Sequence, residues 1–235
     1  MGESGVTAAD MADAGDIDFI QARQSMVELI QFYVDLSSDQ IDRDRLDRRV
    51  LAAMAEVPRH DFVPREFQHL AYEDSPIPIG CDKTTSQPFM VALMTDLLGI
   101  QPGESVLEIG TGIGYHAAIL AELAKAVYTV EIHEELARDA CSRLAALGYG
   151  NVQFKIGDGA QGWPEHAPFD RILVAAAPGL LPAALIQQLR PGGRMVVPAG
   201  LPDDQQLLVV DKDADGHITT REVLQVVFSP LINSH

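Results

Sequence analysis

Three glycines at alternate positions are the first feature of this sequence that could serve chemistry. Gly110, Gly112 and Gly114 follow a short apolar stretch, 105–109, and precede a stretch with helical composition, 115–125. Glycine lets the backbone bend sharply and approach a ligand without a Cβ atom in the way. A strand, a glycine turn and a helix in this order are typical of nucleotide-like ligand sites in α/β proteins. The pattern predicts such a site at this loop.

Two acidic residues follow the glycine loop at the ends of the next two predicted strands. Glu131 lies near the end of the strand at 127–132, and Asp158 comes just after the strand at 152–156. Glu131 could accept hydrogen bonds from both ribose hydroxyls of an adenosine, and Asp158 from the adenine amino group. The alternatives are an exposed acid at a helix start for Glu131 and an Asx turn for Asp158.

A run of hydroxyl side chains precedes a predicted helix at 89–98. Thr84, Thr85 and Ser86 stand before a glutamine and Pro88, and proline suits the first position of a helix. The backbone N–H groups and the dipole at a helix N-terminus favour an anion such as a carboxylate. The alternative is that Ser86 merely caps the helix.

The elements around these residues alternate between strands and helices. We expect two helices before residue 57, the second capped by Asp39, and a turn at 190–193. The alternation predicts a mostly parallel sheet that binds ligands at the carboxyl ends of its strands. The strands are expected at 105–109, 127–132, 152–156, 169–177, 194–198, 205–210 and 223–228.

The segment between the last two strands matches a calcium-binding EF-hand loop at its main positions. These positions are Asp211, Asp213, Asp215, Gly216, Ile218 and Glu222. An EF-hand requires flanking helices, whereas strand-like segments flank this loop. We therefore expect a β-hairpin with its tip at Asp215–Gly216 and no specific metal ion.

Composition limits the possible partners. The chain has 235 residues, of which 47% are apolar, enough for one sizeable core. Its net charge of −17 disfavours binding to nucleic acids and to anionic membranes.

Two cysteines and the absence of a long apolar run predict a cytoplasmic protein with reduced thiols, and we expect a monomer. Residues 1–17 are small and acidic, and we expect them to be disordered.

From about residue 39 to residue 231 the chain resembles the protein-L-isoaspartate O-methyltransferases. The TTSQP segment at 84–88, placed ahead of the glycine loop, is far more specific to that family than the loop itself. Other matching pieces are RVLAAMAEVPRHDFVP, AYEDSPIPIG, VLEIGTGIGY, VYTVE, GDGAQGW, APFDRILVAAAP, LIQQLRPGGRMVVPAG and VVFSPL.

The resemblance implies a class I S-adenosylmethionine-dependent methyltransferase fold. That fold is α/β and Rossmann-like, with a seven-stranded, mostly parallel sheet, N-terminal helices and a terminal β-hairpin. The methyltransferase domain would span 18–235, divided into an N-terminal flank (18–80), a cofactor-binding core (81–200) and a C-terminal hairpin (201–235). S-adenosylmethionine would donate the methyl group, and L-isoaspartyl residues of damaged proteins would accept it.

The resemblance also implies roles for individual residues. Ser86 matches the active-site serine. The expected cofactor contacts are Glu108, Gly110, Gly112, Glu131, Ile132, Asp158 and Gly159, and the expected substrate contacts are Thr85, Val197 and Phe228. Lys83, Thr85 and His116 depart from the residues that the family often has, which bears on substrate preference more than on the reaction.

Three other functions remain open at this point. Relatives of the family methylate an aspartate in a dedicated peptide, although this chain lacks a long C-terminal recognition domain. A nicotinamide dehydrogenase would fit the glycine loop loosely, but no second substrate domain follows. A catalytically silent adaptor with a methyltransferase fold would bind the cofactor without turnover.

Overall fold

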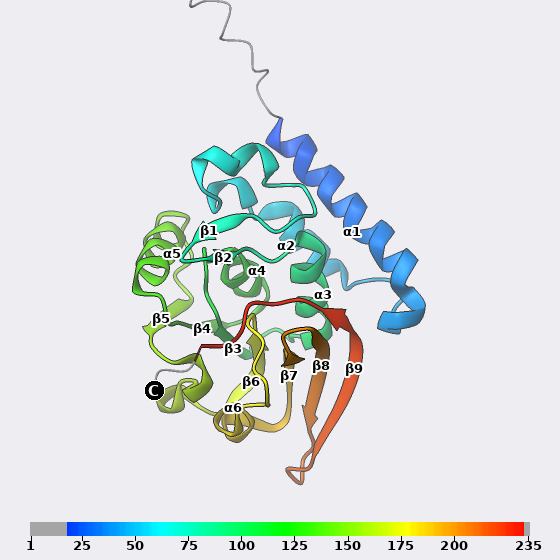
Figure 1. Cartoon of the computed structure of the whole chain (residues 1–235), viewed down its shortest axis with the longest axis vertical. Helices are drawn as coiled ribbons and strands as arrows, with labels where there is room; N and C mark the ends of the chain where they lie inside the picture. The colour runs from blue at the N-terminus through cyan, green and yellow to red at the C-terminus, as the bar shows by residue number, and fades with distance from the viewer. Residues whose placement is uncertain (1–17, 233–235) are drawn as a thin grey trace, which may run out of the picture.

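The computed structural model describes residues 18–232, which form a structure built around a seven-stranded sheet (Figure 1). The predicted disordered segment at 1–17 lies outside the described residues. The strand order is β5-β4-β3-β6-β7-β8-β9, parallel from β5 to β7 and antiparallel at β8 and β9. This confirms the predicted α/β class. The strands are β3 (Ser105–Ile109), β4 (Ala126–Glu131), β5 (Val152–Ile156), β6 (Phe169–Val174), β7 (Leu189–Leu201), β8 (Asp204–Lys212) and β9 (Ile218–Val226).

Helices and short 3-10 turns connect and cover these strands. A separate pair of short strands lies before the third helix. The helices are α1 (Phe19–Ile41), α2 (Arg48–Glu56), α3 (Pro88–Leu98), α4 (Tyr115–Leu123), α5 (Glu134–Ala146) and α6 (Ala183–Gln188). The remaining elements are η1 (Arg59–Asp61), η2 (Arg65–Leu70), β1 (Pro78–Gly80), β2 (Lys83–Thr84), η3 (Gly159–Gln161) and η4 (Pro164–His166).

The alternation of side chains along the central strands explains why both faces of the sheet are covered. On β3, Val106 packs into the cluster that α1 to α4 share, whereas its neighbour Leu107 packs into the cluster around α6. Leu173 and Ile172 on β6 divide in the same way. Successive residues of a strand point to opposite faces, so a strand that is apolar at every position needs helices on both sides.

The boundary between the first two helices differs from the prediction. The predicted cap at Asp39 is wrong, because α1 continues to Ile41 and ends where Asp42 adopts a left-handed conformation with φ 55°. The second helix begins later, where the Asp47 carboxylate accepts a hydrogen bond of 2.8 Å from the Arg49 N–H. Apolar residues on both sides of this break had the spacing of one continuous helix.

The predicted turn at 190–193 is also wrong. These residues belong to β7, which remains paired with β6 on both sides of them, at Leu189 with Phe169 and at Arg194 with Arg171. The register shifts between these pairs, so the additional residues of β7 form an irregularity in the strand rather than its end. A bulge can absorb an Arg-Pro-Gly-Gly sequence that would break a regular strand.

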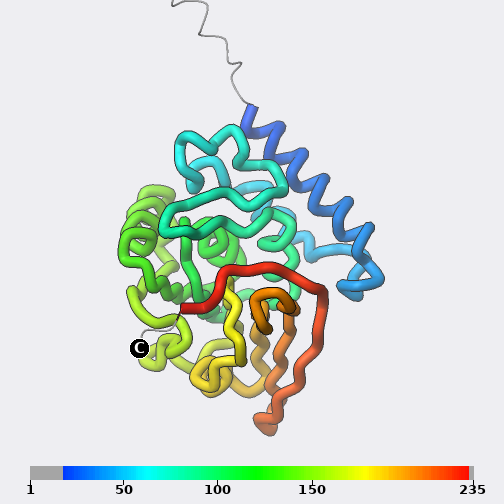
Figure 2. Tube along the Cα trace, viewed as in Figure 1, coloured from blue at the N-terminus to red at the C-terminus, as the bar shows by residue number. Residues whose placement is uncertain are grey.

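The last two strands form the predicted hairpin, and the chain then returns over the sheet. Figure 2 shows the segment after β9 crossing the carboxyl ends of the central strands. Ala177 holds it in place, because its N–H donates to the Ser229 carbonyl and its carbonyl accepts from the Leu231 N–H, both at 2.8 Å. We call residues 227–232 the return segment.

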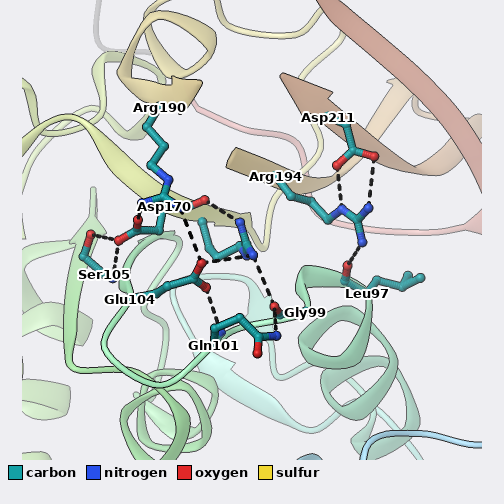
Figure 3. Close-up of polar contacts among 10 residues, drawn as sticks. Leu97, Gly99, Gln101, Glu104, Ser105, Asp170, Arg190, Arg194 and Asp211 are labelled. Carbon is teal, nitrogen blue, oxygen red and sulfur yellow. Dashed lines mark hydrogen bonds and ion pairs between the residues drawn. The ribbon is translucent and has the colours of Figure 1, made fainter. Parts of the chain in front are cut away.

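Ion pairs join the amino ends of β3 and β6 to β7 (Figure 3). The Asp170 carboxylate accepts hydrogen bonds from the Ser105 N–H at 2.6 Å and its hydroxyl at 2.8 Å, and it pairs with Arg190. Burial raises the pKa of Asp170, but these hydrogen bonds and the charges of Arg190 and Arg171 outweigh burial and leave the pKa below its ordinary value. The network therefore fixes the strand ends opposite to those that bind ligands.

Among the helices of residues 18–232, none is both long and apolar enough to cross a membrane. Cys81 and Cys141 are free thiols, as predicted.

We expect Asp170→Asn to destabilise the fold by about 1–3 kcal/mol at neutral pH, because the partly buried donors of Ser105 lose a charged acceptor. A carboxyl group whose pKa is lower in the folded state stabilises the protein above its unfolded pKa and loses this effect as the pH falls. The difference between wild type and variant should therefore shrink in acid. Urea unfolding at neutral pH and at about pH 3 would test this. A difference that does not change with pH would contradict it.

Candidate active site

The glycine loop joins β3 to α4 at the carboxyl edge of the sheet. Gly110 has φ +94°, a conformation that other residues rarely adopt, and a Cβ atom there would contact Ala175 at 3.6 Å. The Gly112 N–H donates a hydrogen bond of 2.9 Å to the Glu131 carboxylate. The loop is therefore held against the end of β4, and its backbone lines a hollow.

Glu131 ends β4 and borders the same hollow. Its side chain is buried, and its other carboxylate oxygen accepts from the His133 N–H at 2.9 Å. The alternative of an exposed acid at a helix start is therefore wrong. Two backbone N–H groups fix the orientation of this carboxylate, and oxygens fixed in this way can accept further hydrogen bonds from a diol.

Asp158 and Gly159 follow β5 on the far side of the hollow. The Asp158 carboxylate accepts a hydrogen bond of 2.9 Å from the Ala160 N–H, as in the Asx-turn alternative. Its contact with adenine remains a prediction. Gly159 packs so closely that a Cβ atom would clash with Cγ2 of Ile109. Only glycine therefore allows this segment to approach β3.

The hollow has a volume of about 90 Å³ and is covered by the β1–β2 hairpin and the return segment. It brings together five of the predicted cofactor residues. Its lining includes Gly110, Gly112, Glu131, Ile132, Gly159, Ile79, Lys83, Leu231 and Ile232. The positive-φ glycines and the oriented carboxylate fit the adenosyl group of S-adenosylmethionine.

Ser86 lies between β2 and α3 on the wall of a larger open groove of about 1100 Å³. The N-cap residue of α3 is Gln87, whose side chain makes no capping bond, and the Phe89 N–H in the first turn instead donates a hydrogen bond of 2.8 Å to the Asp74 carboxylate. The alternative that Ser86 caps the helix is therefore wrong, and its hydroxyl has no capping role. Thr85 and Phe228 line the same groove, as predicted for substrate contacts.

The groove and the hollow meet at three residues that line both of them, Thr84, Ala175 and Ser229 of the return segment. Thr84 belongs to the predicted hydroxyl run, whereas sequence reasoning did not single out Ala175 and Ser229 as ligand contacts. A ligand in the hollow and a peptide in the groove would therefore meet next to Ser86. Sequence reasoning singled out Phe228 of the return segment but not its path over the sheet, because that path depends on pairing with Ala177, far away in the chain.

Three predicted contacts, Asp158, Val197 and Glu108, are not part of the lining of these spaces. Val197 is fully buried in the core between β7 and α6, and its role as a substrate contact stays a prediction. Glu108 is also fully buried. Its carboxyl group accepts a 2.6 Å hydrogen bond from the Thr129 hydroxyl, which shares a further bond of 2.5 Å with Thr111 in the glycine loop. Glu108 can therefore act on the loop through these two threonines.

The environment of Glu108 favours its neutral form. Burial raises its pKa to about 8, and the negative charge of Glu131 adds to this effect, while the hydrogen bond from Thr129 opposes it. The second oxygen, Oε1, has no hydrogen-bond partner within the described residues. At neutral pH the buried carboxyl group is mostly protonated.

This raised pKa gives a prediction for Glu108→Gln. The folded state keeps a proton that the unfolded state releases, so the wild type should lose stability as the pH rises from the ordinary glutamate range to about 8. Glutamine cannot ionise, so the variant should lose less stability over this interval. Urea unfolding at about pH 6 and about pH 9 would measure the difference. The exposed Glu28→Gln is the control, and equal pH dependence in Glu108→Gln and wild type would refute the raised pKa.

The EF-hand-like residues do not assemble in the arrangement of an EF-hand. Asp213, Asp215 and His217 lie together at the exposed hairpin tip, with ligand atoms within 4.8 Å of one another. Asp211 instead pairs with Arg194, and Glu222 lies opposite Leu208 in the strand ladder. The strands that flank this loop keep its first and last positions apart.

Comparison with known proteins identifies the family. A sequence profile of the protein-L-isoaspartate(D-aspartate) O-methyltransferases matches residues 36–235. Protein-L-isoaspartate O-methyltransferase 1 from Polaromonas sp. is 57% identical over 214 residues, which is 91% of each chain. The protein of the same name from Cupriavidus necator is 51% identical over 231 residues, 98% of this chain and 87% of that one.

Solved structures agree with this fold. A protein-L-isoaspartate O-methyltransferase superposes with a TM-score of 0.75 at 28% identity, covering 88% of this chain and 65% of that one. A Plasmodium falciparum structure in complex with S-adenosyl-L-homocysteine has a TM-score of 0.75 at 22% identity, which supports the fold alone. The parallel sheet with flanking helices is that of class I S-adenosylmethionine-dependent methyltransferases. The chain belongs to the protein-L-isoaspartate(D-aspartate) O-methyltransferase family.

Proposed function

We propose that Ser86 and the backbone around it bind the α-carboxylate of an L-isoaspartyl residue and direct it toward a methyl donor in the hollow. The chain is a protein-L-isoaspartate O-methyltransferase that uses S-adenosylmethionine, as its family membership indicates. The observation that carries the proposed role is the meeting of groove and hollow at Thr84 and Ala175, next to a serine that caps no helix.

The acceptor needs no general base, because a carboxylate is already ionised at neutral pH. S-adenosylmethionine supplies the methyl group from a sulfonium centre. A new O–CH₃ bond forms as the S–CH₃ bond breaks, and both opposite charges disappear. A site that excludes water favours this loss of charge, and the protein contributes alignment of the two groups.

The remaining residues hold the donor. Glu131 binds the ribose hydroxyls and Asp158 the adenine amino group. Gly110 and Gly112 allow the backbone to approach the donor closely, and Glu108 orients the loop through Thr129. The methyl ester leaves the enzyme and cyclises to a succinimide, as the backbone nitrogen attacks the ester carbonyl and methanol departs with the N–H proton. Hydrolysis of the succinimide returns some normal aspartate, which repairs the damaged protein.

The net charge of the protein bears on its partners and on where in the cell the reaction takes place. A net charge of −17 disfavours association with nucleic acids or anionic membranes, and we expect a cytoplasmic monomer that acts on damaged proteins. Size-exclusion chromatography with light scattering would test the oligomeric state.

The direct test of the function uses two matched peptides, one with L-isoaspartate and one with L-aspartate. We expect labelled methyl groups to pass from S-adenosylmethionine to the isoaspartyl peptide only. Transfer to the aspartyl peptide as well would contradict the specificity. Transfer to neither peptide, with the donor bound, would indicate a dedicated partner or a silent adaptor.

Ser86→Ala should lower kcat/KM for the isoaspartyl peptide by about 10- to 100-fold, the effect expected for one hydrogen bond to a charged group. Donor affinity should stay within about twofold, because Ser86 lies on the acceptor side. Steady-state kinetics and calorimetry with S-adenosylhomocysteine would measure the two effects. An equal loss of both would show that Ser86 is not specific to the acceptor.

Glu131→Gln should give the opposite pattern. We expect donor affinity to fall by about tenfold or more, because a charged acceptor for the ribose hydroxyls and for the Gly112 N–H is lost. At saturating donor, the KM for the peptide should remain close to that of the wild type. Unchanged donor affinity would remove Glu131 from the donor site.

A further inference from the structure

A buried arginine forms hydrogen bonds with Thr85 and Ser86, which we call the Ser86 segment. Arg59 belongs to η1, and its side chain is fully buried. Its Nη2 donates a hydrogen bond of 2.7 Å to the Thr85 hydroxyl and one of 2.9 Å to the Ser86 carbonyl. One guanidinium group therefore fixes both residues that precede α3 on the acceptor side of the site.

The charge of Arg59 lacks a direct counter-ion. No ion pair joins it to a carboxylate anywhere in residues 18–232, and its Nε has no hydrogen-bond partner there. Asp74 contributes only a favourable longer-range attraction, and the Tyr115 ring centroid lies 4.6 Å from the guanidinium carbon. Burial lowers the pKa of Arg59, but an arginine remains charged near neutrality. A buried charge without a partner is costly, and an anionic ligand would offset that cost.

Arg59 also borders a small hollow of about 70 Å³ between the Ser86 segment and the glycine loop. His116 lines the same hollow and is neutral, because burial lowers its pKa to about 3. Its Nε2 shares a 2.9 Å hydrogen bond with the Thr95 hydroxyl. Arg59 is thus the one charged side chain among the described residues that line this hollow.

We propose that Arg59 is a positioning residue that fixes Thr85 and Ser86 and supplies the buried positive charge that favours a carboxylate at the acceptor site. This inference rests on the proposed role of Ser86. Arg59 acts on the acceptor through these two residues and through the electrostatic field of its positive charge.

The chemistry of the reaction determines which kinetic constant should respond. The acceptor carries a negative charge before methyl transfer and none afterwards, so a nearby positive charge stabilises bound substrate more than the transition state or the ester. Removing this charge should therefore raise KM more than it lowers kcat. It should also leave the affinity for the neutral ester almost unchanged.

The test compares two peptides, one with an isoaspartyl α-carboxylate and one with an α-carboxamide at the same position, which serves as an inhibitor. We expect the wild type to prefer the carboxylate, and Arg59→Gln to lose about tenfold or more of that preference. The kcat of this variant should stay within about threefold of the wild-type value. Arg59→Lys should retain much of the preference. Arg49→Gln, which removes an exposed arginine on α2, is the matched control and should retain all of it.

Two other outcomes would overturn the proposal, and a third would overturn the proposed function on which it rests. Equal weakening of both peptides by Arg59→Gln would reduce Arg59 to a structural role and overturn the proposal. Weaker binding of S-adenosylhomocysteine with an unchanged carboxylate preference would also overturn it, because this result would indicate that Arg59 binds the carboxylate of the donor. If the wild type itself transfers no methyl group to the isoaspartyl peptide, the proposed function fails before Arg59 is tested.

A second pair of variants covers the case in which the Arg59 variants do not fold. Thr85→Val removes the hydroxyl oxygen that accepts from Nη2 and keeps the side-chain shape. We expect it to raise the KM for the isoaspartyl peptide about fivefold, with donor affinity near wild type, and Thr85→Ser to restore most of the loss. A KM equal to that of the wild type in Thr85→Val would overturn the positioning role.

Discussion

The hydrogen bond between the Gly112 N–H and the Glu131 carboxylate joins the ends of two neighbouring parallel strands at the point where ligands bind. Because β3 and β4 run in the same direction, their carboxyl ends lie side by side. The glycine loop can turn sharply there only because positive φ angles are available to it. The carboxylate then holds the turned loop in place, so the donor hollow, which both residues line, depends on this contact.

The two edges of the sheet serve different purposes. At the amino ends, Asp170 and the arginines of β6 and β7 form a network that fixes the strands relative to each other. At the carboxyl ends, the contacts come from loops, the β1–β2 hairpin and the return segment. Hydrogen bonds to Ala177 and to the Gln205 side chain hold the return segment, and its Phe228 and Leu231 pack against the core. The two edges of the sheet are thus held by different kinds of contact.

Local patterns in the sequence were sufficient for most of the fold. The glycine loop and the acids after β4 and β5 all depend on residues close in the chain, and the structure brings them to one edge of the sheet. The error at Asp39 arose because α1 continues to Ile41 and Asp47 caps the next helix instead. The error at 190–193 arose because pairing with β6 overrode the local signal.

The candidate site was harder to predict in detail. Val197 lies on a predicted strand, but its face of the sheet points into the core. Sequence reasoning did not identify Arg59 as part of the site, because an arginine beside prolines is usually exposed. Only in the folded chain does its side chain lie within hydrogen-bonding distance of Thr85 and Ser86.

A molecule with a net charge of −17 repels other anions over long distances, yet its substrate is a carboxylate. Salt screens exposed charges within about 8 Å at physiological ionic strength, whereas buried charges are screened much less. A single buried guanidinium next to the acceptor site can therefore outweigh many surface carboxylates farther away. The protonated state of Glu108 has a related effect, because it removes one negative charge from beneath the glycine loop. These two buried groups thus make the field at the site less negative than the overall charge of the protein implies.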